Sequence, residues 1–418
     1  MRVLVSAYGC GPGRGSEPGV GWNWARQLAR HFDVWVLSPE SERAAIEDFL
    51  RSGPLPNLTF VFCDLPRSIR FRNDGPLLQY HLHLYLWQAA ALFAARKLHA
   101  EVGFDVAHHI TVGMHWRWSF LAFLPVPFLW GPVGGAEHAP RPFFRSFSTR
   151  GKMQAIQRFV IQKLGEFDPL MRCTARRAAL TLAKTKQTAV RVSALGARRT
   201  RVMSEAGMPA DEIERLAAMP LRQGGPLRLL SLGRLLHWKG FELGLRAFAA
   251  FVERFPGSEY WIVGDGPERS RLEKLAEELG VRGQVKFWGT LPRATVLERL
   301  ADCDVLVHPS LHDSGGWVCL EGMAAGRPVV CLDLGGPGVQ VTNETGIKIE
   351  ATTPGQAVRD MADAFALLNG NRELQRRLGQ AGRTRVQQYF AWERKAEVFV
   401  PLYDALAASG ARADLAVH

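Results

Sequence analysis

The segment LVHPSLHDSGGWVCLEGMAAGRPVV, residues 306–330, places a buried strand, two carboxylates, paired glycines and a helix start in one unit. The apolar run Val305–His308 is followed by Pro309, which predicts the carboxyl end of a buried strand. Gly315 and Gly316 come next in the loop, where the missing Cβ lets the backbone approach a ligand closely. Open α/β sheets bind ligands just outside the carboxyl ends of their strands, so this segment predicts a ligand site.

A helix is expected to begin directly after these glycines, because apolar residues recur at Val318, Leu320 and Met323. The unpaired N–H groups and the dipole of a helix start favour a phosphate or a carboxylate there. Glu321 lies one turn inside the helix, where its carboxylate can accept hydrogen bonds from two vicinal hydroxyls, as a ribose presents. The residues expected to line the ligand are Ser314, Gly315, Gly316, Trp317 and Val318.

This unit resembles the acidic signature of glycosyltransferase family 4, whose members are retaining enzymes of the GT-B fold. The family pattern is Glu, seven residues, Glu, with a glycine three positions after the first Glu; this chain has Asp313, Gly316 and Glu321 at those places. Asp313 stands where the family pattern has Glu. Its side chain is one methylene shorter, which moves the first carboxylate by roughly 1.5 Å. The resemblance implies that Asp313 positions the donor sugar and that Glu321 anchors the ribose. The alternative is that Asp313 caps the helix and Glu321 is solvated.

A second cluster precedes this unit in LRLLSLGRLLHWKG, residues 227–240, where an apolar strand ends at Gly233. Arg234 and Lys239 follow that strand end. A planar guanidinium and a compact ammonium suit a diphosphate, and the resemblance implies that these two cations neutralise the leaving nucleotide diphosphate. The alternative is ordinary surface charge.

Two further strands are predicted in YWIVGDGP, residues 260–267, and KFWGTL, residues 286–291. The resemblance implies that the backbone around the second strand end reads the nucleotide base. Gly264, Gly289 and Leu291 are therefore expected to line the donor, although structural turns explain the two glycines equally well.

Near the amino terminus, CGPGRGSEPGVGWNW, residues 10–24, is a glycine-rich loop that enters a helix. It lacks the GxGxxG spacing of a dinucleotide-binding fingerprint. The resemblance implies a loop that faces the donor, with Gly15, Ser16 and Glu17 near the sugar; the alternative is a flexible surface loop.

The acceptor side is expected between residues 101 and 138, which contain two predicted strands. Some family members carry a histidine that contacts the donor sugar after the strand equivalent to residues 128–130, but this chain has GPVGG at residues 131–135. No catalytic histidine is therefore transferred to this chain from the resemblance. The acceptor-side candidates are His109, His115, Gly134, Gly135 and His138.

Charge is concentrated in residues 141–202, which hold fifteen lysine or arginine residues against two acidic residues, a net charge of +13 in a chain of net charge +12. Interleaved phenylalanines make anionic lipid headgroups or a pyrophosphate-linked lipid acceptor possible partners. Nucleic acid is a competing partner, but no recognised DNA- or RNA-binding motif accompanies the segment. An ordinary solvated basic face is the remaining alternative.

Length and composition predict two domains, since the chain has 418 residues of which 47% are hydrophobic. The expected organisation is an amino-terminal Rossmann-like domain at 1–208, a linker at 209–226, a nucleotide-sugar-binding Rossmann-like domain at 227–390 and a crossing helix with tail at 391–418. The resemblance implies an α/β fold of the GT-B type, with the two domains facing across a cleft and the last helix returning to the first domain.

The six cysteines show no CxxC or metal-ligand spacing, and no signal peptide or run of 18 apolar residues is present, so a cytoplasmic location is expected, with possible attachment to the inner face of a membrane. No DxD-like pair lies in a loop suited to hold a metal ion, so no metal cofactor is expected.

These observations predict a retaining hexosyltransferase that uses a nucleotide-diphosphate sugar and a glycan or lipid-linked acceptor, in polysaccharide or glycoconjugate synthesis. The alternatives are a nucleotide-sugar epimerase of the GT-B type and a non-catalytic protein that binds a sugar nucleotide or anionic lipid.

Overall fold

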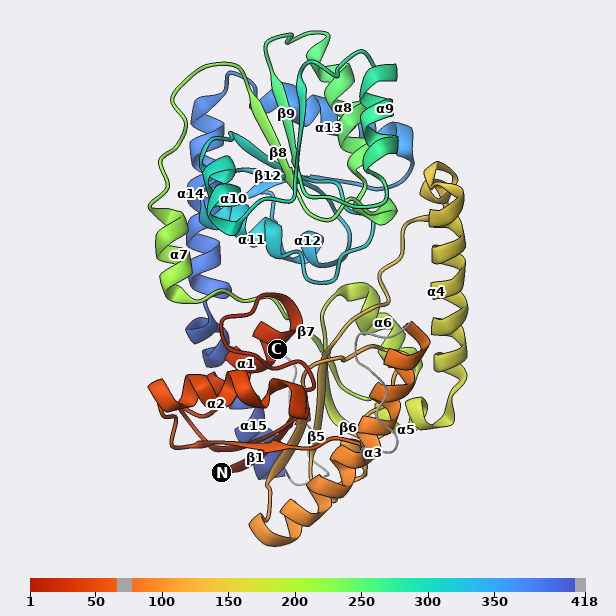
Figure 1. Ribbon diagram of the computed structural model, residues 1–418, viewed down its shortest axis with the longest axis vertical. Coiled ribbons are helices and arrows are strands. Elements are labelled where there is room, and N and C mark those ends of the chain that lie inside the picture. The colour runs from red at the N-terminus through yellow and green to blue at the C-terminus, as the bar shows by residue number, and fades with distance from the viewer. Residues whose placement is uncertain (66–76, 410–418) are drawn as a thin grey trace. The chain divides into compact units, whose positions relative to one another are not determined.

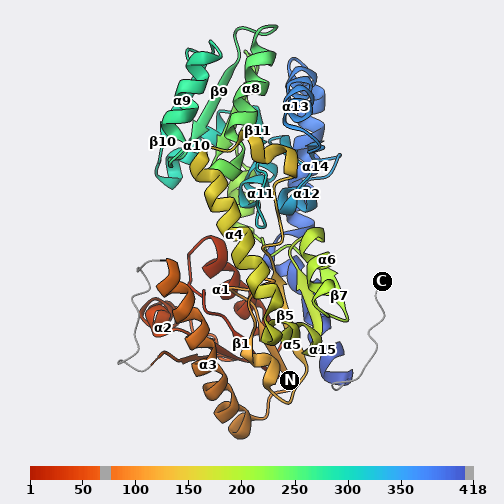
Figure 2. The same ribbon diagram turned by 90° about the vertical axis from the view of Figure 1, so that its right-hand side faces the viewer.

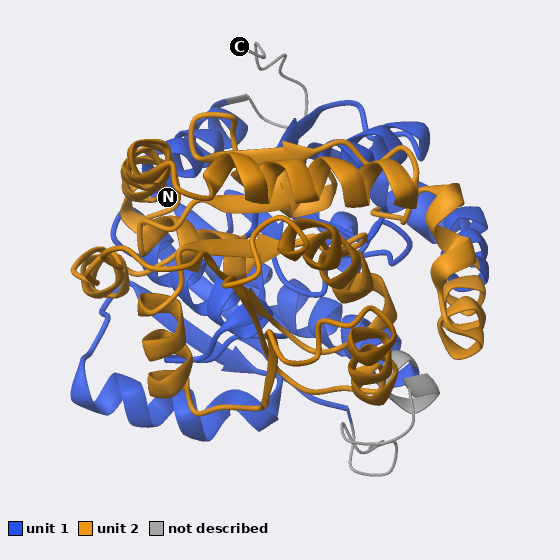
Figure 3. Cartoon of the chain, turned by 90° about the horizontal axis from the view of Figure 1, so that it is seen from above, with its two compact units in different colours: residues 1–136, 160–205, 395–418 blue, residues 137–159, 206–394 orange. Residues whose placement is uncertain are grey.

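The computed structural model describes residues 1–65 and 77–409. The chain divides into two compact units (Figure 3): unit 1 contains residues 1–136, 160–205 and 395–418, and unit 2 contains residues 137–159 and 206–394. Each unit is built on one parallel sheet whose strands are connected by helices (Figure 1). The expected α/β fold with two Rossmann-like domains is therefore confirmed.

Unit 1 has a seven-stranded sheet with the order β3-β2-β1-β4-β5-β6-β7, in which every neighbouring pair is parallel. The strands are β1 (Arg2–Ser6), β2 (Asp33–Ser38), β3 (Leu58–Phe62), β4 (Val106–His109), β5 (Phe128–Val133), β6 (Ala178–Ala183) and β7 (Thr200–Val202). The helices are α1 (Ser16–Leu28), α2 (Arg43–Ser52), α3 (Leu77–Val102), α5 (Pro169–Arg177), α6 (Lys186–Ala194) and most of α15 (Trp392–Ser409). The strand order reverses between β1 and β4, which are neighbours at the centre of the sheet.

Unit 2 has a six-stranded parallel sheet with the order β10-β9-β8-β11-β12-β13. The strands are β8 (Arg228–Leu232), β9 (Glu259–Val263), β10 (Val285–Gly289), β11 (Val305–His308), β12 (Val329–Leu332) and β13 (Gly346–Ile349). The helices are α7 (Ala210–Ala217), α8 (Phe241–Val252), α9 (Arg269–Glu278), α10 (Arg293–Ala301), α11 (Trp317–Ala324), α12 (Gly335–Gln340), α13 (Pro354–Leu368) and α14 (Arg372–Tyr389). The order reverses between β8 and β11, the position at which doubly wound sheets bind ligands.

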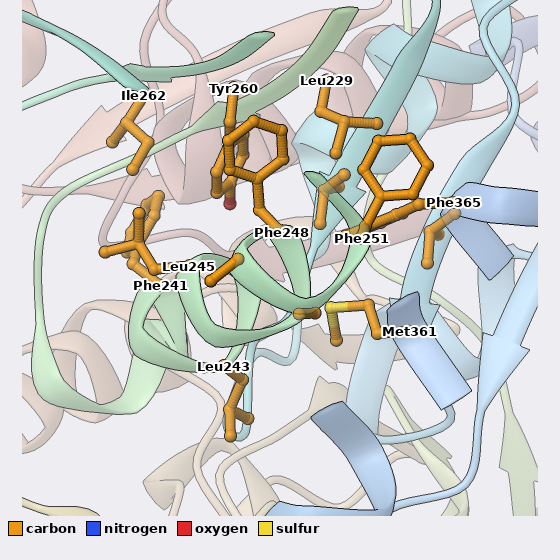
Figure 4. Close-up of a cluster of buried hydrophobic side chains, with 14 of the residues drawn as sticks. Leu229, Phe241, Leu243, Leu245, Phe248, Phe251, Tyr260, Ile262, Met361 and Phe365 are labelled. Atoms are coloured by element: carbon orange, nitrogen blue, oxygen red, sulfur yellow. The ribbon is translucent and has the colours of Figure 1, made fainter. Parts of the chain in front are cut away.

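The sheet of unit 2 is buried on both faces, so its strands are almost wholly apolar. On one face Phe248 and Phe251 of α8 pack with Tyr260 of β9 and Phe365 of α13 (Figure 4). A second cluster, formed by α7, α10, α11 and α14, covers the other face. These two layers hold the ends of β8 and β11 in place.

Residues 137–159 belong to unit 2, although the sequence interpretation placed them in the first domain. The reason is hydrophobic burial: Phe143 and Phe147 lie in the same core cluster as α8 and α13. Helix α4 (Thr149–Phe167) then continues from unit 2 into unit 1 as one uninterrupted helix (Figure 2).

The carboxyl-terminal helix α15 returns to unit 1 from Lys395 onward. Its Tyr403 hydroxyl accepts a hydrogen bond from Trp24 Nε1 at 3.0 Å and bonds to His108 Nδ1 at 2.5 Å. Burial lowers the pKa of His108 to about 3, so this histidine is a neutral structural residue that ties α15 to the first sheet. Within the part of the chain that the structure describes, no helix combines the length and apolarity that a membrane span requires.

Candidate functional site

The candidate site of unit 2 is formed by the loops that follow β8 and β11, the two neighbouring strands at the reversal of the sheet. The Leu311 N–H donates to the Trp238 carbonyl at 2.8 Å, which joins the two loops. Gly240 has a φ of +68°, and a Cβ at this position would lie 1.9 Å from the Pro309 carbonyl oxygen. Only glycine allows this close approach, so Gly240 brings the cation-bearing loop against the carboxylate-bearing loop.

Asp313 is held by four hydrogen-bond donors. Its Oδ2 atom lies 2.6 Å from Lys239 Nζ and 3.1 Å from His308 Nε2. Its Oδ1 atom accepts the N–H groups of Gly315 at 3.2 Å and Gly316 at 3.1 Å. An ionised carboxylate has about four acceptor positions, so all of them are engaged within the loops themselves.

The electrostatics of Asp313 follow from these contacts. Burial alone would raise its pKa, but the hydrogen bond from His308 and the positive charge of Lys239 outweigh burial and hold the pKa well below its usual range. Because an ionised carboxylate only accepts hydrogen bonds, the proton of the His308 ring is assigned to Nε2. Asp313 therefore orients Lys239 and the turn that enters α11.

Arg234 lies directly after Gly233, whose φ is +144°. Its side chain is exposed and forms no hydrogen bond or ion pair within residues 1–65 and 77–409. An exposed guanidinium at the carboxyl end of a central strand is available for an anionic ligand.

Helix α11 begins at Trp317, as the sequence predicts, with Gly316 preceding it at a φ of +59°. A Cβ on Gly316 would lie 2.6 Å from Gln340 Oε1, so the turn is tightly packed. Asp313 links this helix start to Lys239, because it accepts both the Gly316 N–H and the Lys239 ammonium, and the unpaired N–H groups of a helix start favour an anion.

Glu321 forms an ion pair with Arg293, whose Nη1 lies 2.8 Å from Glu321 Oε1. The same arginine reaches Glu212 with its Nη2 atom, also at 2.8 Å. Burial raises the pKa of Glu321, and the charge of Arg293 opposes this shift. Because Arg293 stands at the start of α10, the pair joins Glu321 to the loop that follows β10.

The strand ends of β8, β9 and β10 meet at three glycines. The Gly264 N–H donates to the Gly289 carbonyl at 2.8 Å, and a Cβ on Gly264 would lie 2.0 Å from the Gly233 carbonyl oxygen. Leu291 packs at the edge of the second core cluster. The structure therefore brings Gly233, Gly264 and Gly289 together, while Leu291 also has a role in packing.

Three residues near the site were missed by sequence reasoning: His308, His312 and Arg293. His308 and His312 both precede Asp313 in the same short segment, and Arg293 follows the predicted base-reading loop. The signal for the histidines was their spacing around Asp313, whereas the pairing of Arg293 with Glu321 depends on the fold.

In unit 1, Glu17 links the glycine-rich loop to the loop that follows β4. Its Oε1 atom accepts the Val112 N–H at 2.7 Å, and Gly15 directly precedes α1, which begins at Ser16 with a φ of +60°. A Cβ on Gly19 would lie 2.2 Å from the Arg14 carbonyl oxygen, so the loop is packed against its own helix. Glu17 thus holds the loop after β4, in addition to any contact with a ligand.

The acceptor-side candidates fall into different environments. His109 is buried, its Nδ1 lies 3.1 Å from Ser119 Oγ, and burial lowers its pKa to about 4. His115 is buried and contacts Glu166 at 3.1 Å. Both belong to unit 1, whereas the exposed His138 belongs to unit 2 and lies edge-on to Phe159 at 6.5 Å.

Gly134 and Gly135 are sites of close packing. A Cβ on Gly134 would lie 2.6 Å from Lys184 Cδ. Gly135 has a φ of +98°, and its Cβ would lie 2.2 Å from the Trp116 ring. The packing of unit 1 therefore accounts for both glycines.

Residues 213–385 match the family model for glycosyl transferases group 1. The lipopolysaccharide core biosynthesis glycosyltransferase LpsE of Rhizobium meliloti is 32% identical over 247 residues, which cover 58% of this chain and 69% of LpsE. The chain belongs to the group 1 glycosyltransferases. This conclusion agrees with the resemblance on which the sequence interpretation rested.

Two further comparisons place this glycosyltransferase among its relatives. LpsD of Rhizobium meliloti, another lipopolysaccharide core biosynthesis glycosyltransferase, is 32% identical over 177 residues; these cover 42% of this chain and only about half of LpsD (49%). Among solved structures, HepE of Anabaena in complex with UDP and glucose has a TM-score of 0.60 at 18% identity, over 97% of this chain and 100% of HepE. At this identity the likeness concerns the fold, and it agrees with the GT-B class predicted from sequence.

Proposed function

We propose that this glycosyltransferase is a retaining hexosyltransferase that takes a hexosyl unit from a nucleotide-diphosphate sugar. The acceptor is a hydroxyl of a glycan or lipid-linked molecule, in polysaccharide or glycoconjugate synthesis. The observation that carries the proposal is the convergence of Lys239, the start of α11 and Glu321 at the reversal of the second sheet. The complex of HepE with UDP and glucose supports the choice of donor.

The proposed chemistry is mainly electrostatic. Arg234, Lys239 and the N–H groups that begin α11 stabilise the diphosphate as it leaves the sugar, because charge develops there in the transition state. Asp313 keeps Lys239 in place. Glu321 accepts hydrogen bonds from the ribose hydroxyls, which replace part of its ion pair with Arg293. The loop that contains Gly289 and Leu291 faces the base. No step in this scheme needs a metal ion.

The test is thermal stabilisation and slow donor hydrolysis across UDP-, GDP-, ADP- and dTDP-sugars, with and without EDTA. We expect one base to stabilise the protein selectively, the shift to be lost in Glu321→Ala, and hydrolysis to survive EDTA. Loss of activity in EDTA with rescue by Mn²⁺ would contradict the metal-independent scheme. Stabilisation without turnover over any acceptor would favour a binding protein, and isomerisation of the donor without acceptor would favour an epimerase.

We also propose that the protein associates with an anionic membrane surface through helix α4. Six large apolar side chains of this helix are strongly exposed: Met153 at 68%, Ile156 at 54%, Phe159 at 52%, Val160 at 48%, Leu164 at 68% and Phe167 at 73%. At 100° per residue their spacing confines them to about 140° of the helix circumference.

The charge around this apolar stripe favours an anionic partner. Residues 138–165 contain six lysine or arginine residues and no acidic residue. Around the helix, Lys152 and Lys163 lie between Phe159 and Ile156, and Arg150 borders the stripe beyond Leu164. Exposed apolar side chains together with cations are typical of helices that lie in the interface of anionic bilayers.

The double variant Leu164→Ser/Phe167→Ser is expected to lose most of its co-flotation with vesicles of phosphatidylglycerol, because the two most exposed aliphatic and aromatic side chains of the six become polar. A matched control is Leu367→Ser/Tyr389→Ser, which removes two side chains exposed at 55% and 59% on α13 and α14. The control should float like the wild type. Equal flotation of all three proteins, or flotation with neutral vesicles alone, would contradict the proposal. If the wild type is a dimer and the α4 substitutions dissociate it, the stripe is instead the contact surface for a second copy of the chain.

A further inference from the structure

The sugar-binding role expected for the first carboxylate is not supported by the contacts of Asp313. Four donors already occupy its acceptor positions: Lys239, His308, Gly315 and Gly316. A sugar hydroxyl would have to displace one of them. The donor-contacting histidine of some family members is also missing from the segment after β5, which is GPVGG. The transferred sugar therefore needs another polar partner close to the diphosphate position.

His312 directly precedes Asp313 in the loop after β11 and is partly exposed. Its ring lies 6.3 Å from the ring of Trp238, the residue before Lys239. The backbone of this loop is fixed, since Leu311 N–H donates to the Trp238 carbonyl at 2.8 Å and Ser310 Oγ donates to the His312 carbonyl at 3.2 Å. The loop that carries His312 is therefore held against the loop that carries Lys239, the cation that we assign to the diphosphate.

The two ring nitrogens of His312 form no hydrogen bond within residues 1–65 and 77–409. This differs from His308, which donates to Asp313. It also differs from His109, which is bonded to Ser119. A histidine whose backbone is fixed at the strand ends and whose ring nitrogens have no hydrogen-bond partner in the protein is available to a ligand.

The surroundings of His312 determine its protonation state. Burial and then the positive charge of Arg158 lower the pKa of His312 to about 3; Glu137 and Asp313 act in the opposite direction, and His138 lowers the pKa further. Glu137, His138 and Arg158 all lie in residues 137–159, which unit 2 holds through Phe143 and Phe147. At neutral pH the ring thus carries one N–H donor and one acceptor nitrogen.

A neutral imidazole suits a hydroxyl, which both donates and accepts a hydrogen bond, better than it suits a phosphate, which favours a cation. We propose that His312 hydrogen-bonds a hydroxyl group of the transferred sugar and so acts as the sugar-contacting histidine that the segment after β5 lacks. This inference rests on the proposed nucleotide-sugar function. On this proposal, His312 is the residue through which the protein distinguishes the sugar nucleotide from the nucleoside diphosphate without a sugar.

The test compares the affinity for the nucleoside diphosphate with that for the corresponding sugar nucleotide, by titration calorimetry at pH 7.5 on the full chain. His312→Phe keeps the ring volume but removes both polar nitrogens. We expect it to bind the nucleoside diphosphate as the wild type does and to bind the sugar nucleotide about tenfold more weakly. His312→Gln retains a donor and an acceptor at similar reach, so it should recover part of the loss.

His237→Phe is the matched control, because the ring of His237 also contacts Trp238, at 4.7 Å between ring centroids, and its pKa is also lowered by burial. It should leave the ratio of the two affinities unchanged. An unchanged ratio in His312→Phe, or equal loss of both ligands, would overturn the role of His312 while the proposed donor class stands. A wild type that binds neither ligand would refute the proposed function, and this inference with it.

Discussion

Arg234→Ala is expected to lower kcat by roughly 10²–10³-fold, the typical loss when one preorganised charge-stabilising donor is removed from an active site. The exposed guanidinium follows the central strand β8 and has no side-chain partner in the described part of the protein, so it is available to the leaving diphosphate. For the same reason the free energy of unfolding should change by less than about 0.5 kcal/mol. Steady-state rates with the donor found by the panel, together with urea unfolding, measure both quantities.

Two variants sharpen this prediction. Arg376→Ala removes another exposed arginine, on α14, and should change neither rate nor stability. Arg234→Lys keeps the charge but loses the planar fork of donors, so we expect only partial activity. Lys239→Ala is a less direct test, because it leaves the buried Asp313 carboxylate without its cation. A normal rate in Arg234→Ala would remove Arg234 from the site.

Gly240→Ala is expected to destabilise unit 2 by about 2–5 kcal/mol. The new Cβ would lie 1.9 Å from the Pro309 carbonyl oxygen, so the loops after β8 and β11 must separate. Overpacking of this kind costs about 1–3 kcal/mol, and the left-handed conformation adds about 1–2 kcal/mol for a residue with a Cβ. The separation also moves Lys239 away from Asp313, so donor binding should weaken together with stability.

Gly280→Ala isolates the steric part of this effect. Gly280 has a φ of +70°, almost that of Gly240, but a Cβ there would meet no atom within 4 Å. We therefore expect a loss of only about 1–2 kcal/mol and normal donor binding. Equal unfolding midpoints for the two variants, measured in urea, would show that the contact between the loops does not limit the stability of unit 2.

Local patterns predicted the strands and helix starts well. Strand β11 has the bounds of the apolar run Val305–His308, and α11 begins at Trp317 after the paired glycines. The predicted cation cluster after β8 and the carboxylate cluster after β11 also lie at neighbouring strand ends. Such features depend on residues close in sequence, where hydrophobic periodicity and glycine conformation act directly.

The partners of the site residues could not be predicted in the same way. Asp313 pairs with Lys239, which is 74 positions away, and Glu321 pairs with Arg293 from another loop. Residues 137–159 were expected in the first domain but lie in unit 2, because burial of Phe143 and Phe147 outweighs their position in the chain. Glu17 was expected at a ligand, and its carboxylate holds the backbone at Val112.

By itself, the sequence determined two parallel α/β domains, the strand ends that carry charge and the family to which the chain belongs, since these follow from short-range patterns of apolar, glycine and charged residues. Only the tertiary structure decided which of these groups remain available to a ligand. Asp313 accepts hydrogen bonds from four donors, whereas the side chain of Arg234 and the ring nitrogens of His312 have no hydrogen-bond partner among the described residues. The physical reason is that a buried polar group must be satisfied by whatever the fold brings within hydrogen-bond distance, and that distance is set by packing between segments far apart in the chain.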